Sequence, residues 1–140
     1  MIYIGIDTGV HTGFAVYDSD TKKLGTVQTM KIHEAMRIVK KYKEYGSQKF
    51  MVRFEDARQR TWFGHNSAQQ DRARLQGAGS VKRDCQIWED YLTDLRIPFE
   101  MVAPKNNATK LTAEQFRRIT GYEGKTNEHG RDAAMLVYGF

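Results

Sequence analysis

The sequence predicts an α/β fold in which helices flank one mixed sheet of five strands. Short runs rich in β-branched and aromatic residues alternate with turn signals, and the first run, 2–6, is apolar throughout, as in a strand buried on both faces. Only short turns separate the first three runs, which is typical of an antiparallel meander. The two later runs each follow a segment with apolar residues at helical spacing, so their strands should lie parallel to the first.

The elements are expected in a fixed order along the chain. They are strands at 2–6, 14–17 and 24–29, a helix at 31–45, a strand at 49–54, a helix at 72–95, a strand at 97–102 and helices at 111–120 and 128–140. Thr8-Gly9, Thr12-Gly13 and the polar loop at 18–23 supply the turns between the first three strands. In the first helix Lys and Glu lie between the apolar residues, and Gly46 is a suitable C-terminal stop.

The second half of the chain holds the longest helix and the more polar connections. The segment 56–70 is polar and basic, which favours a loop. The helix at 72–95 should turn a set of apolar side chains toward the core: Ile87, Trp88, Tyr91, Leu92 and Leu95. Small residues at 77–80 would let another backbone approach this helix closely. Ala103-Pro104 ends the last strand, and Thr112 is a candidate N-cap for the next helix.

The composition favours one soluble domain with an anionic partner. The 140 residues fit a single domain, 1–140, without a linker or repeat. No stretch approaches the ~20 apolar residues of a membrane span, so no membrane partner is expected. The single cysteine, Cys85, cannot form an internal disulfide; it fits a reducing cytoplasm and a small buried position on a helix. The net charge of +5 favours nucleic acid as the partner.

Two of the predicted core strands end in an acid. Asp7 follows the first strand, and Glu55 follows the fourth. A buried acid at a strand exit is costly unless a group pairs with it, which leaves either a local turn role or a cation. If the two strands are parallel neighbours, both carboxylates emerge at the edge where ligand sites of open α/β sheets lie.

The last helix adds further polar side chains to this edge. His129 and Asp132 are three residues apart, so they share one helix face. Near two carboxylates this face would be repulsive without a cation, and a divalent metal would turn the cluster into an oxygen-rich site with one imidazole. The alternative is a capping role for Glu128 and solvated side chains at the other two positions. Acids after two strands and on the closing helix together favour the metal site.

Three segments, IGIDTGVHTGFAV, FEDA and NEHGRDAAMLV, resemble the motifs of RuvC-like Holliday junction resolvases. The resemblance spans the chain in element order and implies an RNase H-like fold with strand order 3-2-1-4-5. It also implies a phage-type, metal-dependent endodeoxyribonuclease that acts on branched DNA as a homodimer, in a bacterial or phage-infected host cytosol. By motif, Asp7, Glu55 and Asp132 match the family's acids. His129 stands where members carry a second Asp or sometimes a His.

The expected chemistry is phosphodiester hydrolysis with two Mg²⁺ or Mn²⁺ ions about 4 Å apart. Asp7 would bridge the ions, Glu55 would complete one, and His129 with Asp132 would complete the other. The resemblance implies products with a 5′-phosphate and a 3′-hydroxyl. Because the family has basic residues after the fifth strand, Lys110 is a candidate for a catalytic or phosphate-binding role.

Basic residues and one aromatic pair are candidate DNA contacts outside the metal site. The candidates are Arg58, Arg60, Trp62, Phe63, Arg72, Arg74, Lys82, Arg83, Lys105 and Lys110. Arginine binds phosphate, and an exposed aromatic ring can stack on an unpaired base. Alternatively, Trp62 or Phe63 packs into the core or a dimer contact, and the lysines are solvated.

Two other functions are compatible with parts of the sequence. The segment IGIDTG also resembles the phosphate-binding hairpin of actin-like and sugar-kinase-like ATPases, although that fold usually needs two such lobes. The second alternative is a nucleic-acid-binding module of the same fold with weak or no catalysis. The acids Asp7, Glu55 and Asp132 argue against this second alternative.

Overall fold

Five strands form one mixed sheet in the computed structural model, which describes residues 1–59, 68–104 and 110–140, and only the backbone of 68–78. The strands are β1 (Ile2–Asp7), β2 (His11–Asp18), β3 (Lys23–Lys31), β4 (Phe50–Glu55) and β5 (Phe99–Val102). Their order across the sheet is β3-β2-β1-β4-β5, which confirms the predicted order. β2 is antiparallel to β1 and β3, whereas β4 is parallel to β1 and β5.

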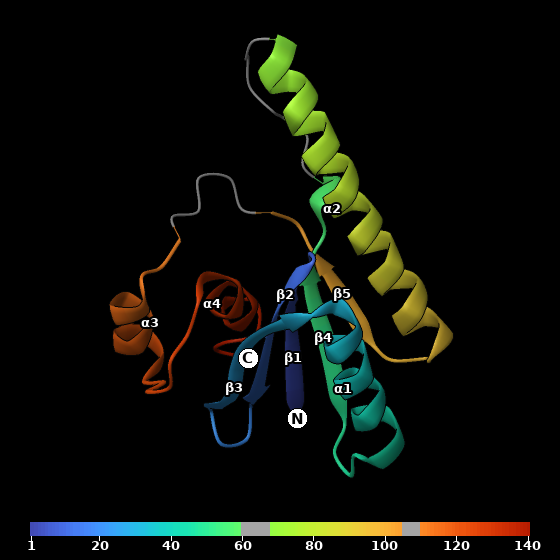
Figure 1. The fold of residues 1–140 in the computed structure, drawn as a ribbon. Coiled ribbons are helices and arrows are strands. Elements are labelled where there is room, and N and C mark those ends of the chain that lie inside the picture. Colours follow the sequence, from blue (N-terminus) through green and yellow to red (C-terminus); the bar gives the residue numbers. More distant parts are fainter. Residues whose placement is uncertain (60–67, 105–109) are drawn as a thin grey trace.

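Helices cover both faces of the sheet (Figure 1). They are α1 (Ile32–Tyr45), α2 (Ala68–Asp94), α3 (Ala113–Thr120) and α4 (Glu128–Met135), with a short 3₁₀ helix η1 (Ala57–Gln59) after β4. The larger hydrophobic cluster joins β1, β2 and β4 to α1 and α2. The smaller cluster joins β2 and β3 to α3 and α4. The structure therefore has helix–sheet–helix layers, as expected for an α/β fold.

One stripe of α2 packs into the larger cluster. Cys85, Trp88 and Leu92 are fully buried, and they follow one another at the spacing of a single helix face. Cys85 therefore has the buried helical position that its sequence context predicts. Ile87 was expected in the core, but the prediction is wrong because Ile87 lies about 100° around the helix from Trp88 and is 40% exposed. α2 is the longest helix, yet no helix within the described ranges is long and apolar enough to cross a membrane.

Several element ends differ from the predictions for identifiable reasons. β5 begins at Phe99, two residues later than expected, because Pro98 has no N–H to donate to a strand ladder. α4 ends at Met135 instead of residue 140, since the N–H groups of Leu136 and Val137 reach back only three residues. The cap of α3 is confirmed: Thr112 accepts from the N–H of Gln115, whose side chain accepts from Thr112 in return.

Candidate functional site

Asp7 and Glu55 lie at the same edge of the sheet. β1 and β4 pair in parallel with Ile6 opposite Phe54, so the next residues in register are the two acids. Ile6 and Phe54 are fully buried in the α1–α2 layer. Because successive side chains of a strand alternate between faces, Asp7 and Glu55 belong to the face that α4 covers.

Two glycines bring α4 unusually close to this face. A methyl group on Gly5 of β1 would collide with the carbonyl oxygen of Ala133, and one on Gly13 of β2 would collide with that of His129. Asn127 fixes the start of the helix, since its side chain accepts from the N–H of Gly130 at 3.2 Å and from the hydroxyl of Thr29 in β3. The first turn of α4 is thereby held over the ends of β1 and β2.

One polar contact of this turn joins His129 to Asp7. The imidazole Nδ1 lies 2.9 Å from the carboxylate Oδ2 of Asp7. An ionised carboxylate only accepts hydrogen bonds, so Nδ1–H donates, and the lone pair of a neutral ring is then on Nε2. Burial raises the pKa of Asp7; the hydrogen bond from His129 opposes this rise, and the charge of Asp132 adds to it. A nearby cation would therefore stabilise the ionised form of Asp7.

Lys110 bridges the other two acids of the helix. Its ammonium lies 2.6 Å from Oε1 of Glu128 and 3.0 Å from Oδ2 of Asp132. The hydrogen bond to Glu128 is the main cause that raises the pKa of Lys110, while burial lowers it and the bond to Asp132 adds to the rise. The same bond lowers the pKa of Glu128. The lysine side chain is 59% exposed, so its charge also faces solvent at this edge.

The side chains at this edge are of the types that bind divalent cations. Asp7, Asp132 and Glu55 offer carboxylate oxygens, and His129 offers an imidazole nitrogen, which are ligands of Mg²⁺ and Mn²⁺. The raised pKa of Asp7 points the same way, because a bound cation would offset both its burial and the repulsion from Asp132. Within the ranges that the structure describes, no group of three His, Cys, Asp or Glu side chains converges on one point. Metal binding would therefore require side chains to move from these positions.

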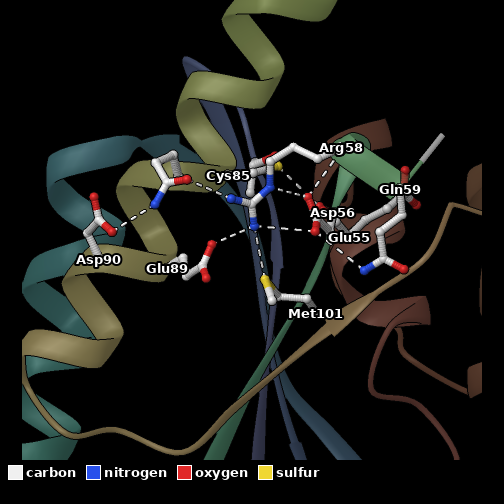
Figure 2. A network of polar contacts seen from close by, with 10 residues as sticks. Glu55, Asp56, Arg58, Gln59, Cys85, Glu89, Asp90 and Met101 are labelled. Carbon is white, nitrogen blue, oxygen red and sulfur yellow. Dashed lines mark hydrogen bonds and ion pairs between the residues drawn. The ribbon is translucent and has the colours of Figure 1, made fainter. Parts of the chain in front are cut away.

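A hydrogen-bonded network holds the segment that follows Glu55 (Figure 2). The guanidinium of Arg58 donates to Asp56 at 2.7 Å from Nε, to Gln86 at 2.8 Å, and to Glu89 at 2.6 Å. Burial would raise the pKa of Asp56, but hydrogen bonds from Arg58 and Gln59 outweigh it and hold that pKa below its ordinary value. These contacts fasten the end of β4 to α2.

Arg58 therefore has partners that the sequence did not indicate. It was predicted to bind phosphate, whereas its guanidinium is occupied by groups of its own chain: Asp56, Gln86, Glu89 and the sulfur of Met101. The bonds to Asp56 and Glu89 also raise its pKa. The contacts support a role in positioning the chain after Glu55.

The other predicted DNA contacts divide into described and undescribed residues. Lys82 and Arg83 are exposed on α2, and Arg83 lies 3.7 Å from Asp84. Arg60, Trp62, Phe63 and Lys105 lie outside the described residues, as do the side chains of Arg72 and Arg74.

His11 was not among the residues that the sequence singled out. The ring of His11 at the start of β2 stacks beside that of His129, with centroids 6.3 Å apart and planes inclined by 27°. The signal was present in Gly13, two residues further along the strand on the same face, which marks where a backbone approaches closely. A scan against models of protein families finds no match for the chain, and a search of curated proteins finds no relative.

Proposed function

We propose that the protein is a metal-dependent endonuclease that hydrolyses phosphodiester bonds in branched DNA, with Holliday junctions as the expected substrate. The observation that carries the proposal is the contact of His129 with Asp7 at the end of the central strand. Asp132 follows one turn along the same helix, and Glu55 ends the neighbouring parallel strand. Parallel strand ends in an open α/β sheet are where ligands bind, and the sequence motifs resemble those of resolvases at these same positions.

The metal ions and the side chains have separate roles in this proposal. Asp7, Glu55, His129 and Asp132 would hold Mg²⁺ or Mn²⁺, which when bound supplies activation of the attacking water and stabilisation of the leaving oxygen. His129 orients the carboxylate of Asp7 through its Nδ1–H. Lys110 offsets the charges of Glu128 and Asp132 and presents an exposed ammonium to a phosphate oxygen.

Charge supports a nucleic-acid substrate, and the resemblance of the motifs suggests a branched one. The net charge of +5 favours a polyanion, and the exposed Lys82 and Arg83 lie on α2, which extends beyond the sheet (Figure 1). A four-way junction needs two symmetric cuts, and a homodimer with a two-fold axis would place one site at each. The lone Cys85 agrees with a cytoplasmic protein.

A cleavage assay tests the proposal most directly. Wild-type protein is incubated with junction, flap, duplex and single-stranded DNA in Mg²⁺, Mn²⁺ or chelator, beside Asp7→Asn. We expect metal-dependent cutting of branched DNA, its loss in Asp7→Asn, and unchanged binding of that variant to junctions in a gel shift with Ca²⁺. Cutting by Asp7→Asn at the wild-type rate would show that the site is wrongly assigned.

A binding module without catalysis is the second candidate, and one observation favours it. Lys110 already bonds to Glu128 and Asp132, and among the residues described no three metal-binding side chains converge. A lysine that neutralises these acids permanently would leave them unable to bind metal. In that case the wild type would bind junctions tightly but cut none of the four DNAs with either metal.

A further inference from the structure

A groove lies directly beside the candidate site. It has a volume of about 410 Å³, and its lining residues are Val10, His11, Lys31, Ile32, His33 and Met36. They come from the turn between β1 and β2, the end of β3 and the first turns of α1. The volume falls within the roughly 300–1,000 Å³ of small-ligand sites in proteins.

The floor of the groove is apolar, although it faces solvent. Val10 is 67% exposed at the tip of its turn, so its aliphatic surface is open to a ligand in the groove. Ile32 and Met36 are half-buried, and Met36 packs against the larger hydrophobic cluster. This packing anchors the Met36 side chain in the floor of the groove.

The rim of the groove carries basic and aromatic groups. His11 of β2 stands opposite Lys31 of β3 in the strand register, and His33 follows on α1. None of the six lining residues is acidic; Glu34 in the first turn of α1 is outside the groove. An apolar floor with a lysine and two imidazoles at its rim complements a flat, uncharged ring attached to an anion.

The groove is continuous with the candidate site through His11. His11 lines the groove, and its ring stacks beside that of His129, which bonds to Asp7. A DNA strand whose phosphate lies at Asp7 would thus bring its neighbouring nucleotide to the groove.

We propose that this groove binds one unstacked nucleotide of the DNA strand, next to the phosphate that is cut. The inference rests on the proposed function and names a substrate requirement of the same site. The base lies on Val10, Ile32 and Met36, and the phosphate of that nucleotide pairs with Lys31. Nucleotides at a branch point unstack at lower cost than those within a duplex, so the groove favours branched over plain duplex DNA.

The first experiment measures binding without cleavage. A short single-stranded oligonucleotide and a duplex of equal length are titrated in chelator into ¹⁵N-labelled wild-type protein. The amide signals of Val10, Lys31 and His33 should shift with the single strand and much less with the duplex. Shifts confined to α2, or no binding of the single strand, would overturn the proposal and leave the groove to a different ligand, such as a peptide.

Matched variants then test the groove in affinity. Val10→Ser is compared with Ile119→Ser, which changes a 49% exposed aliphatic residue on α3, and Lys31→Ala with Lys23→Ala at the other end of β3. Val10→Ser should weaken single-strand binding about fourfold, the loss of one buried methylene-sized contact. The affinity falls as salt is added, and Lys31→Ala should make this dependence shallower. The slope of log affinity against log salt should be smaller in magnitude by about 0.7, as one lost phosphate contact requires. The two control variants should bind as the wild type does.

The results distinguish a failure of the groove proposal from a failure of the nuclease proposal. If wild-type protein cuts branched DNA and all four variants bind equally, the groove proposal is wrong and the nuclease proposal stands. If no DNA is cut but the groove signals shift and the two groove variants bind more weakly than their controls, the groove stands and the nuclease proposal fails.

Discussion

The imidazole of His129 donates to the carboxylate of Asp7 across 2.9 Å, although 122 positions separate the two residues in the sequence. The bond joins the end of the central strand to the first turn of α4. It only partly offsets the burial of Asp7 and the charge of Asp132, so the pKa of Asp7 stays above its ordinary value. The ionised carboxylate therefore lowers the stability of the folded protein at neutral pH.

Asp7→Asn should raise the thermal stability of the metal-free protein. Between the unfolded pKa near ~3.9 and the raised folded pKa, the native state binds more protons, so the free energy of unfolding falls as the pH rises. The neutral amide does not ionise, so the free energy of unfolding no longer falls for this reason. Each gain of ~1 kcal/mol in that free energy raises Tm by roughly 2–8 °C. Thermal melts in chelator from pH 4 to 8 should show a gain for Asp7→Asn that grows with pH. Asp18→Asn is the control, because the pKa of Asp18 is lowered by backbone hydrogen bonds and its loss should bring no gain. A lower Tm for Asp7→Asn at pH 7 would contradict the argument.

Divalent metal should stabilise the wild type and not Asp7→Asn. A ligand that binds only the native state raises the free energy of unfolding by about 2.7 kcal/mol when its concentration is 100 times its Kd. Melts with increasing Mn²⁺ or Mg²⁺ measure this gain without any DNA. Asp132→Asn should also lose most of it, whereas Asp18→Asn, which pairs with Ile2 at the opposite end of β1 from Asp7, should keep it. An equal metal-induced gain in wild type and Asp7→Asn would place the metal elsewhere.

His129 should set the metal preference of cleavage. Imidazole suits Mn²⁺ better than Mg²⁺, which prefers oxygen ligands. The wild type is therefore expected to cut faster with Mn²⁺, His129→Asp to recover relative activity with Mg²⁺, and His129→Ala to lose most activity with both. Initial rates are measured beside Glu128→Gln, which alters the preceding residue. If His129→Ala retains full activity and Glu128→Gln loses it, Glu128 is the ligand instead.

Lys110→Met should separate phosphate binding from metal binding. The lysine holds Glu128 and Asp132 at 2.6 and 3.0 Å, so its loss frees both acids for a cation while removing a charge that faces DNA. Metal-induced stabilisation should increase, and cleavage at limiting DNA should fall by about tenfold or more, as expected for one charge-assisted contact of about 1.5–3 kcal/mol. Lys125→Met, a change in an exposed lysine just before α4, is the control. Unchanged metal binding and cleavage would make Lys110 a surface residue without a role in the site.

Arg58→Met should destabilise the fold more than it weakens DNA binding. The guanidinium bonds to the buried Asp56 and to Glu89, and losing such charged hydrogen bonds costs about 1.5–3 kcal/mol. Because the folded pKa of Asp56 is depressed, this stability is present above the unfolded pKa near ~3.9 and is lost as the pH falls through the folded pKa. Urea titrations at pH 7 and in acid should show a difference from wild type that shrinks in acid.

The control for Arg58 is another arginine of the same region. Arg83→Met changes an exposed side chain with a long ion pair to Asp84, so it should alter stability by less than about 0.5 kcal/mol. If Arg58→Met were as stable as wild type and bound junctions more weakly, Arg58 would be the phosphate contact that the sequence suggested.

Local sequence pattern determines the strands and helices of this protein, but not how its helices are rotated and docked. Apolar runs and the helices between them were enough to predict five strands and the parallel direction of β4 and β5, whereas the strand order was expected from the resemblance of the three motifs. That order places the acids at the ends of β1 and β4 at one edge. The partners of Arg58 were not predictable, because they depend on the rotation of α2 about its axis. The misplaced Ile87 reflects that same rotation. The stacking of His11 on His129 depends on how closely α4 docks, which no single-residue propensity encodes.

The close docking of α4 on Gly5 and Gly13 also bears on how the protein is made. Between synthesis of Asp7 and of His129 a ribosome adds 122 residues, which takes roughly 6–25 s at about 5–20 residues per second. In the last part of that interval, after β5 has been made, a nascent chain has its five strands without the helix that covers Ala15 and Val27. A chaperone that recognises apolar strand surface would thus meet this face of the sheet before α4 is complete, and the contact between Asp7 and His129 would form only after His129 has been synthesised.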